Sequence, residues 1–278
     1  MDSSIEDGPE LRNGVMMPWL GLGVLGMPAN GSARAAVSTA LEVGCRRVDT
    51  AASYGNESEV GQAIRSSGVP RSRVFVTTKV WNVVQGYHPT RAAFDVSLER
   101  LGIDYVDLCL VHWPFAGDFH ETWRALEAVY REGRARAIGV SNFLVHHLEE
   151  LLKLAEMLPM VNQVELHPLL QQPKLRSYCR AQHIQVEAWR PLMHGAVTDI
   201  PALVTLAEKH GKTPVQVVLR WILQKEVVAI PKTSRRHRME SNADVFDFEL
   251  PPEDVKLIDS LNEGRRLGPH PDEFRPSA

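Results

Sequence analysis

Four side chains with the chemistry to protonate a carbonyl oxygen are spread along the chain. Asp49 ends a short apolar run, Tyr54 follows it by five residues, and Lys79 and His112 lie at the ends of two later apolar runs. An ammonium group beside a phenol lowers the phenol pKa from its ordinary value near ~10. Lys79 would supply that charge to Tyr54, and Asp49 would hold Lys79 protonated. Tyr54 would then be the general acid toward a carbonyl oxygen oriented by His112.

Each of these residues also has an ordinary structural interpretation. Asp49 could cap the turn after its strand, and Tyr54 could be a half-buried aromatic residue. Lys79 could be a solvated charge and His112 a hydrogen-bonded core residue. Taken alone, the segment from Gly44 to Gly61 favours the structural interpretation. The coincidence of four such groups in one apolar environment is costly unless they satisfy one another, and it favours a catalytic site.

Eight apolar runs that alternate with helical patterns must bring these residues together. The runs predict strands at 20–24, 46–49, 74–80, 105–111, 136–140, 160–166, 184–189 and 227–230. Helices are predicted after a Ser32 cap, after Thr90 up to Gly102, and from Thr213-Pro214. Nearly continuous apolar strands covered by helices indicate a parallel sheet, and a closed (β/α)8 barrel of the TIM type fits best. Active sites of such barrels lie at the C-terminal ends of the strands, where the four side chains fall.

Two segments flank the predicted barrel. Asn13-Gly14 between apolar residues predicts a β-hairpin with a type I′ turn before the barrel. The segment from Arg265 to Ala278 is rich in proline, glycine and charge, so it is either a frayed tail or a flap over the barrel mouth. A chain of 278 residues with 44% apolar content is expected to form a single domain over residues 1–278.

Charge and cysteine usage narrow the functional class. The net charge of −3 is spread over interleaved acids and bases, which argues against a nucleic-acid partner. The densest basic run, 235–238, suits either a solvated helix end or a single phosphate group. Cys45, Cys109 and Cys179 are scattered and odd in number, so we expect buried free thiols in a reducing compartment.

No membrane or metal signal accompanies these features. The N-terminus is acidic and polar, and no segment is apolar enough to span a bilayer, so we expect a cytoplasmic protein without a membrane partner. No HExxH or other spaced ligand set is present, and no metal is expected. His146 and His147 are adjacent, so a helix would point them in different directions, and we interpret them as surface residues.

Several segments together resemble the aldo-keto reductases. They are GCRRVDTAASYGNESEVG from Gly44, KVWN from Lys79, LVHWP from Leu110, GVSNF from Gly139, NQVE from Asn162 and IPKT from Ile230, with Arg238 and Asn242 beyond. The resemblance covers nearly the whole chain. The chain looks most like the bacterial 2,5-diketo-D-gluconate reductases.

This resemblance implies a function and a set of site residues. Asp49, Tyr54, Lys79 and His112 would form the catalytic tetrad of an NADPH-dependent reductase of aldehydes and ketones. NADPH would lie across the barrel mouth without a Rossmann fold. The cofactor residues implied are Ser141, Asn142 and Gln163 at the carboxamide, Trp189 stacked on the nicotinamide, Lys232, Thr233, Ser234 and Arg238 at the 2′-phosphate, and Asn242 near the adenine. The substrate pocket would be lined by Leu22, Trp81, Trp113, His270 and Phe274.

Small aldehydes, α-keto esters or keto sugars such as 2,5-diketo-D-gluconate would fit this pocket, and we expect a monomer. The chain departs from the family pattern at Cys45, at Arg190, at the turn 193–195 and at Ser241. Arg190 either pairs with the cofactor pyrophosphate or points outward. Two other functions stay open: a Schiff-base lyase that uses Lys79, and a regulatory barrel that binds NADPH without catalysis.

Overall fold

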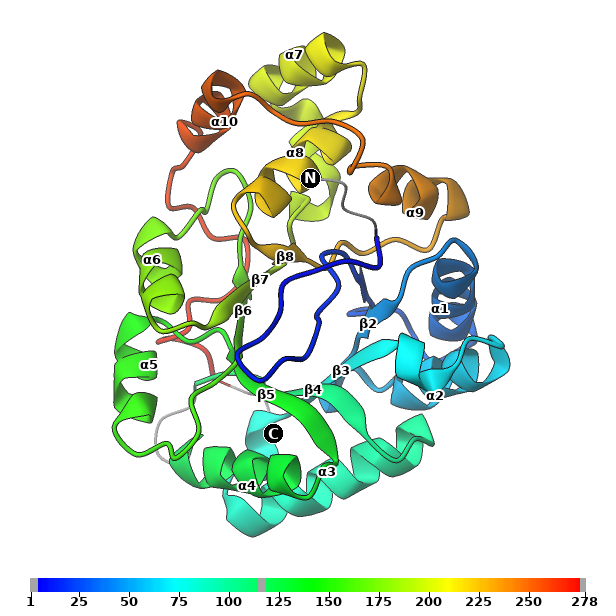
Figure 1. Cartoon of the computed structure of the whole chain (residues 1–278), viewed down its shortest axis with the longest axis vertical. Coiled ribbons are helices and arrows are strands. Elements are labelled where there is room, and N and C mark those ends of the chain that lie inside the picture. Colours follow the sequence, from blue (N-terminus) through cyan, green and yellow to red (C-terminus); the bar gives the residue numbers. More distant parts are fainter. Residues whose placement is uncertain (1–4, 115–118, 276–278) are drawn as a thin grey trace.

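A closed barrel of eight parallel strands forms the centre of the molecule (Figure 1). The computed structural model describes residues 5–114 and 119–275. Within this part of the chain the strands pair in sequence order, and a parallel bridge between Leu20 and Ala229 joins the last strand to the first. The strands are β1 (Leu22–Gly23), β2 (Arg47–Asp49), β3 (Phe75–Val80), β4 (Val106–Val111), β5 (Ala135–Ser141), β6 (Val161–Glu165), β7 (Gln185–Trp189) and β8 (Val228–Ala229). The predicted barrel is confirmed, and each predicted strand ends within two residues of an observed one.

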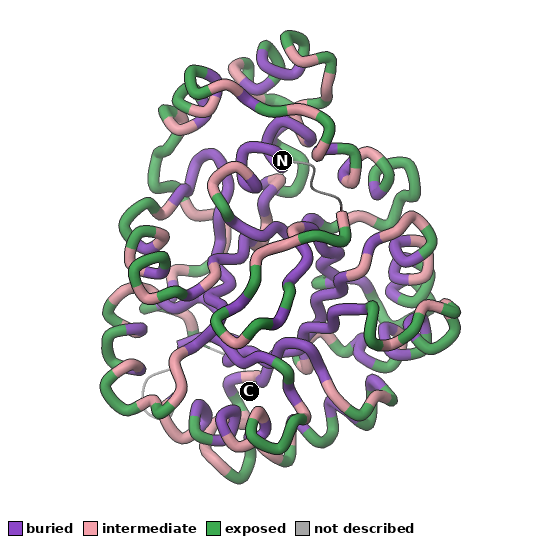
Figure 2. The backbone as a smooth tube through the Cα atoms, in the orientation of Figure 1, coloured by how far each residue is buried: buried purple, intermediate pink, exposed green. Residues whose placement is uncertain are grey.

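Helices surround the barrel, with their buried residues on the side that faces the strands (Figures 1 and 2). The α-helices are α1 (Ser32–Glu42), α2 (Glu57–Ser66), α3 (Tyr87–Leu101), α4 (Phe119–Arg131), α5 (Val145–Leu152), α6 (Pro173–Ala181), α7 (Pro201–His210), α8 (Pro214–Gln224), α9 (Arg236–Ala243) and α10 (Pro252–Asp259). Short 3₁₀ turns lie at η1 (Ala52–Tyr54), η2 (Arg71–Arg73), η3 (Asn82–Val84) and η4 (Met193–Asp199). This arrangement leaves the loops after the strands free to build a site.

The predicted helix ends are partly confirmed. The Thr213 hydroxyl accepts the N–H of Gln216 at 3.2 Å and caps α8, as expected. Gly102, with φ 62°, follows the last residue of α3. Ser32 is the first residue of α1 rather than its cap. Thr90 lies inside α3, which begins three residues earlier at Tyr87, and its hydroxyl donates to Val84 O at 3.2 Å.

The N-terminal hairpin closes the end of the barrel that lies opposite the site. An antiparallel bridge joins Glu10 to Met16, and Leu11, Val15 and Met17 pack with residues at the starts of several strands. The hairpin is confirmed, but its type I′ turn is wrong, because only Gly14 of the turn has a positive φ (84°). The loop is a three-residue turn of the kind that ends in a left-handed glycine.

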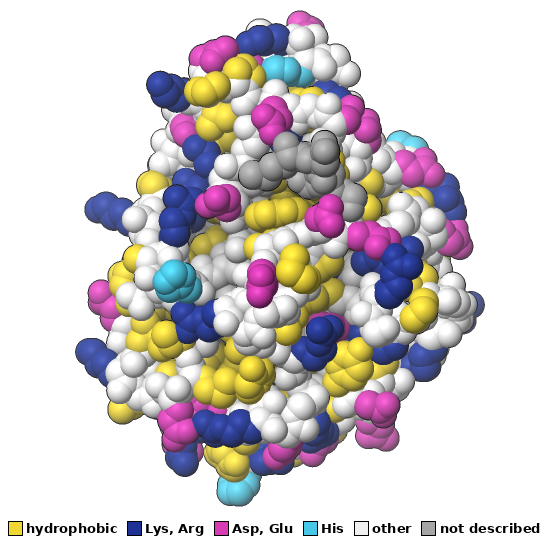
Figure 3. Space-filling model, viewed as in Figure 1, with side chains coloured by type: hydrophobic (Ala, Val, Ile, Leu, Met, Phe, Trp, Pro, Cys, Tyr) yellow, Lys and Arg dark blue, Asp and Glu magenta, His cyan; other side chains and the backbone are white. Residues whose placement is uncertain are grey.

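The surface and the cysteines agree with the expected class. All three cysteines are buried and free. On the face shown in Figure 3, basic and acidic side chains are interspersed. Within 5–114 and 119–275, no helix has both the length and the apolar content that a membrane span requires.

Candidate active site

Lys79 lies at the centre of a buried polar cluster at the C-terminal ends of β2 and β3. Its Nζ is 2.6 Å from Asp49 Oδ1, 3.2 Å from Tyr54 Oη and 2.9 Å from the carbonyl oxygen of Thr50. Asp49 pairs with Thr77 in the register of β2 and β3, so Lys79, two residues further on, points into the same space. The η1 turn returns the chain so that Tyr54 meets the ammonium. Three residues predicted to act together are therefore in contact.

His112 completes this group from the end of β4. Its ring lies 5.7 Å from the Tyr54 ring in an edge-to-face arrangement. The Ser53 hydroxyl lies 3.5 Å from His112 Nδ1. A hydroxyl that donates to Nδ1 would place the imidazole proton on Nε2, the nitrogen that is free to meet a substrate oxygen.

The pKa values in the cluster follow from burial and from the Lys79 charge. Burial opposes the ammonium form of Lys79, but the charges and hydrogen bonds of Asp49 and Tyr54 outweigh it and raise the pKa of Lys79. Burial, with the Lys79 charge acting in the same direction, lowers the pKa of His112 well below its ordinary value. Lys79 is therefore held protonated, as predicted, and His112 is neutral near pH 7.

The predicted pKa shift of Tyr54 is wrong in direction. Burial raises the pKa of Tyr54 above its ordinary value, and the nearby Lys79 charge reduces this effect without reversing it. The phenol is surrounded by protein on most sides, so the desolvation of the phenolate exceeds the attraction of one ammonium that Asp49 already neutralises in part. Tyr54 therefore holds its proton at neutral pH, as a proton donor must.

Aromatic rings form one wall beside His112. The Trp81 ring lies 5.1 Å from the His112 ring, edge to face. Phe274, from the C-terminal tail, stacks on Trp113 with ring centroids 4.1 Å apart and 17° between the planes, and its edge meets Trp81 at 5.9 Å. The tail therefore reaches the barrel mouth as a flap through residue 275, and residues 276–278 of the predicted flap lie outside the described part.

Leu22, assigned to the substrate pocket, faces away from the site, and His270 makes a contact within the tail. Leu22 is buried and lines a small cavity with Ala40, Cys45 and Met239, between β1 and the helices α1 and α9. Its neighbour Gly23 pairs with Asp49, and side chains alternate along a strand, so Leu22 faces the helices. His270 accepts the Asp272 N–H at its Nδ1 (3.3 Å) within a turn of the tail. The prediction for Leu22 is wrong, whereas a pocket role for His270 stays a prediction.

Asn142 and Trp189 are joined at the ends of β5 and β7. Trp189 Nε1 donates to Asn142 Oδ1 at 2.8 Å. Asn142 Nδ2 donates to His112 O at 3.0 Å and lies 3.1 Å from Ser141 Oγ. Asn142 has φ 67°, a left-handed conformation that asparagine tolerates better than most residues. The residues predicted to bind the carboxamide are thus adjacent to the tetrad.

Gln163 links this group to the tetrad from β6. Its side-chain Nε2 donates to Asp49 Oδ2 at 2.8 Å, and its main-chain carbonyl oxygen accepts a hydrogen bond from the Ser141 hydroxyl at 2.9 Å. Asp49 therefore has one oxygen on Lys79 and the other on Gln163. The sequence indicated a cofactor role for Gln163 but did not reveal this second role.

Comparisons with known proteins identify the family. The family model described as "Aldo/keto reductase family" matches residues 20–263. The chain is 56% identical over 274 residues to the glyoxal reductase of Bacillus subtilis (strain 168), with 99% of each chain covered. It is 43% identical over 269 residues to the methylglyoxal reductase DkgA of Escherichia coli (strain K12), covering 95% of this chain and 97% of the relative. A Bombyx mori aldo-keto reductase, solved in complex with NADP, has a TM-score of 0.89, 34% identity and 96% coverage of each chain.

The chain belongs to the aldo/keto reductase family. It is therefore an oxidoreductase, and the aldo-keto reductase resemblance noted in the sequence is confirmed.

The predicted phosphate site of this aldo/keto reductase lies after β8 and at the start of α9. Lys232, Ser234 and Arg238 are exposed, and the Thr233 hydroxyl accepts the Arg235 N–H at 3.2 Å. In the part of the chain that the structure describes, Lys232 and Arg238 have no ion-pair partner. Two cations without partners at the barrel mouth suit a phosphate group.

Neighbouring residues of the same helix behave differently. Arg236 pairs with Glu42 and Glu240, so it is already satisfied within the protein. Asn242 is largely buried, and it lines the same small cavity as Leu22 and Thr233. Among the described residues, Lys232 and Arg238 are thus without an ion-pair partner, whereas Arg236 is paired with acidic residues of the protein. The sequence could not distinguish these two kinds of cation.

Arg190 stacks on its neighbour Trp189, a contact that the sequence did not indicate. Its guanidinium lies 5.2 Å from the centre of the Trp189 ring, a cation–π arrangement, and its backbone has φ 56°. Gly268 of the tail packs directly against the Trp189 ring. A Cβ atom at this position would lie 2.5 Å from Trp189 Cη2, so only glycine fits there. Trp189 is therefore fixed by Asn142, Arg190 and the tail.

Other contributors in this reductase were missed from sequence. Glu165 is fully buried, and its carboxylate accepts the N–H groups of Leu267 (2.8 Å) and Gly268 (3.1 Å) in the tail. Asn82 Nδ2 donates to the carbonyl oxygen of Trp113 at 2.7 Å and fixes that aromatic residue. Glu165 lies within the NQVE segment, but nothing in the sequence indicated that its partner is the tail.

Proposed function

We propose that this chain reduces small aldehydes and ketones to alcohols with NADPH, with Tyr54 as the proton donor. The observation that carries the proposal is the contact of Lys79 Nζ with both Asp49 Oδ1 (2.6 Å) and Tyr54 Oη (3.2 Å) in a buried site. A neutral phenol held against a fixed ammonium can give up its proton and leave a phenolate that the ammonium stabilises.

When bound, NADPH supplies a hydride to the carbonyl carbon. The oxygen of that carbonyl gains negative charge and takes the proton from Tyr54 Oη. His112, neutral because its pKa is lowered, donates from Nε2 and orients the oxygen. Lys79 stabilises the phenolate that remains, and Asp49 keeps Lys79 protonated and in place.

The residues around the mouth fit this cofactor. Lys232 and Arg238, exposed cations without ion-pair partners among the described residues, would hold the 2′-phosphate together with Thr233 and Ser234. The remaining contacts would come from Ser141, Asn142, Gln163, Trp189, Arg190 and Asn242. The NADP complex of the Bombyx mori relative supports this assignment.

The aromatic wall supports small substrates. Trp81, Trp113 and Phe274 narrow the space beside His112, which favours compact carbonyl compounds. The Bacillus subtilis and Escherichia coli relatives are named glyoxal reductase and methylglyoxal reductase, which supports 2-oxoaldehydes as the first class to test. We keep α-keto esters and keto sugars such as 2,5-diketo-D-gluconate in the same substrate class.

Other functions fit the site less well. A Schiff-base lyase needs an unprotonated lysine, but Lys79 is buried against a carboxylate and its pKa is raised. A regulatory barrel without catalysis would not need the complete tetrad. We also propose a monomer in the cytoplasm, where three buried free thiols would stay reduced.

A panel of carbonyl compounds assayed with NADPH and NADH in parallel tests this proposal. The panel should contain methylglyoxal, glyoxal, an α-keto ester, a keto sugar and 4-nitrobenzaldehyde. We expect turnover of several compounds and a higher kcat/KM with NADPH. Binding of NADPH without turnover of any compound would overturn the proposal in favour of the regulatory barrel.

A further inference from the structure

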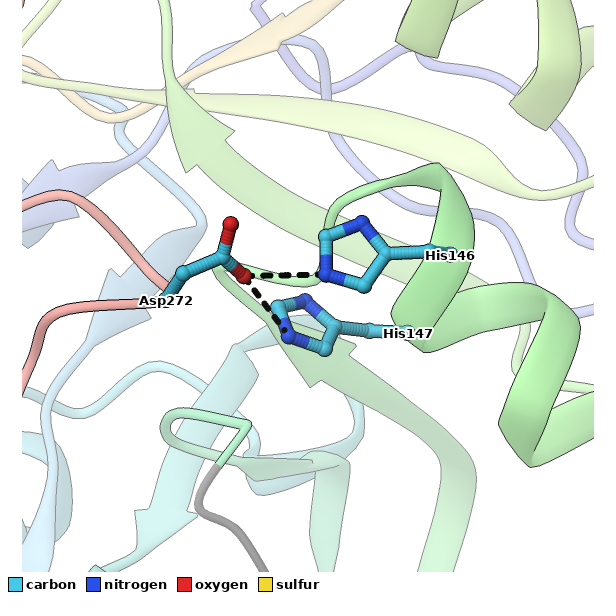
Figure 4. A group of neighbouring side chains, drawn as sticks. All are labelled: His146, His147 and Asp272. Carbon is cyan, nitrogen blue, oxygen red and sulfur yellow. Dashed lines mark hydrogen bonds and ion pairs between the residues drawn. The ribbon is translucent and has the colours of Figure 1, made fainter.

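The start of α5 and the C-terminal tail meet at His146, His147 and Asp272. Figure 4 shows both imidazole rings directed at the same carboxylate. Asp272 Oδ1 lies 2.9 Å from His146 Nε2 and 3.1 Å from His147 Nε2. The expectation that the adjacent histidines point in different directions is wrong. Their rings lie 4.0 Å apart at the helix end, where one carboxylate reaches both.

The protonation of His147 is fixed by the backbone. His147 Nδ1 accepts the N–H of Leu144 at 3.1 Å, which caps the first turn of α5. Burial, and then the His146 charge, lower the pKa of His147 to about 4, so the ring is neutral near pH 7. A neutral ring that accepts at Nδ1 carries its proton on Nε2. His147 therefore presents its Nε2 proton on the side of Asp272, whose Oδ1 lies 3.1 Å away.

This tautomer argues against a metal site at the three residues. Their ligand atoms lie within 4.8 Å of one another. A metal bound at His147 Nε2 would need that nitrogen without its proton, and the proton would then move to Nδ1. Nδ1–H would face the N–H of Leu144, and the cap of α5 would be lost. The cluster is better suited to hold the tail through the hydrogen bond of His146 to Asp272 and the close approach of His147.

The contact at Asp272 is transmitted to Phe274 by a tight turn. The N–H groups of Glu273 and Phe274 both donate to His270 O at 3.0 Å, and the N–H of Asp272 donates to His270 Nδ1. Asp272 and Phe274 therefore lie in one compact unit. Phe274 stacks on Trp113 at 4.1 Å, so a fixed Asp272 also fixes the ring that closes the aromatic wall.

A separate anchor holds the earlier part of the tail. Glu165 accepts the N–H groups of Leu267 and Gly268, several residues before Asp272. Loss of the Asp272 contact would therefore release the end of the tail without detaching its beginning. The two anchors can be tested independently.

We propose that His146, His147 and Asp272 form a latch that positions Phe274 and so determines how well the enzyme accepts aromatic carbonyl substrates. The three latch residues are positioning residues, since they act through Phe274. The effect on substrates rests on the proposed function, whereas the position of the tail does not. Two separate measurements therefore test the two parts.

Limited proteolysis tests the position of the tail. Chymotrypsin cleaves after Phe274 only when that residue leaves Trp113, and intact-mass spectrometry detects the loss of the last four residues. We expect His146→Ala and Asp272→Ala to speed this cleavage about fivefold, which corresponds to one lost hydrogen bond. The double variant should be cleaved little faster than Asp272→Ala, because both changes remove the same contact.

His88→Ala is the matched control. His88 is an exposed histidine at the second position of α3, as His146 is at the second position of α5. It lies outside the latch, so its cleavage rate should equal that of the unchanged protein. We avoid His147 variants because they would also remove the cap of α5. Equal cleavage of all variants and the unchanged protein would overturn the latch.

Kinetics test the effect on substrates. In Asp272→Ala and His146→Ala, the KM for 4-nitrobenzaldehyde should rise about threefold to tenfold, the worth of one aromatic contact, with kcat unchanged. The KM for methylglyoxal and the KM for NADPH should stay the same, since methylglyoxal has no aromatic ring and NADPH does not bind through Phe274. Faster cleavage with unchanged KM for 4-nitrobenzaldehyde would overturn the role in selectivity. If the unchanged protein reduced no carbonyl compound, the proposed function would fail, while the cleavage rates would still decide the latch.

Discussion

The ammonium nitrogen of Lys79 lies 3.2 Å from the phenol oxygen of Tyr54. The two residues come from β3 and from the turn after β2, and both are enclosed by the barrel mouth. Burial alone disfavours both charged forms, yet the pair is arranged so that a proton lost from Tyr54 leaves a charge that Lys79 can stabilise. The predictions that follow concern this pair and the residues that serve it.

Replacement of Lys79 by methionine should separate stability from catalysis. Asp49 would become a buried carboxylate without a counter-charge, so the free energy of unfolding should fall by roughly 3–5 kcal/mol. The double variant Lys79→Met/Asp49→Asn should regain part of this loss in urea unfolding, because no buried charge is left unpaired. It should remain inactive with NADPH and methylglyoxal. Recovery of activity in the double variant would show that Lys79 acts only by supporting Asp49.

Carbonyl reduction should be insensitive to pH over a wide range. The reaction needs a protonated Tyr54, and burial raises the pKa of that phenol, so the active form persists from neutral to alkaline pH. His112 stays neutral because its pKa lies well below the ordinary value. We expect kcat/KM to be flat between about pH 6 and 9 and to fall only as Tyr54 loses its proton. A change in kcat/KM with its midpoint near the ordinary pKa of histidine would contradict this account of His112.

The preference for NADPH should depend on Lys232 and Arg238. Charge-assisted hydrogen bonds contribute about 1.5–3 kcal/mol when well formed, and exposure reduces this value, so we expect the double alanine variant to lose at least about tenfold in kcat/KM with NADPH. The values with NADH should change little, since NADH lacks the 2′-phosphate.

Arg236→Ala is the control for this assignment. Arg236 lies on the same helix end but pairs with Glu42 and Glu240. Its removal should leave the ratio of kcat/KM values for NADPH and NADH unchanged. An equal loss in this control would mean that the basic surface attracts NADPH as a whole and that no defined phosphate site exists.

The barrel and the four central residues could be predicted from sequence because they depend on local patterns. Apolar runs and helix caps are written in neighbouring residues, and the C-terminal ends of parallel strands always share one side of a barrel. Leu22 was misplaced because the resemblance gave its place in the chain but not the register of β1 against β2, in which Gly23 and not Leu22 pairs with Asp49. The type I′ turn failed because the hairpin closes over three residues, with the Leu11 N–H donating to Val15 O at 2.9 Å, and such a loop places only its last residue, Gly14, in the left-handed region.

Contacts between distant segments were harder to predict from the sequence. The pKa of Tyr54 was predicted in the wrong direction because the degree of enclosure, and not the identity of its partner, sets the larger effect. The hydrogen bonds of Glu165 to the tail and the contacts of Asp272 with the two histidines join segments about a hundred residues or more apart. No local pattern marks either pair.

The turnover of Tyr54→Phe tests the central claim most directly. The substitution removes one oxygen atom and keeps the ring, so NADPH binding, measured by fluorescence titration, should be unchanged. We predict that kcat for methylglyoxal with NADPH falls by a factor on the order of 10² or more, the usual contribution of a positioned acid. Undiminished turnover in this variant would contradict the assignment of Tyr54 as the proton donor.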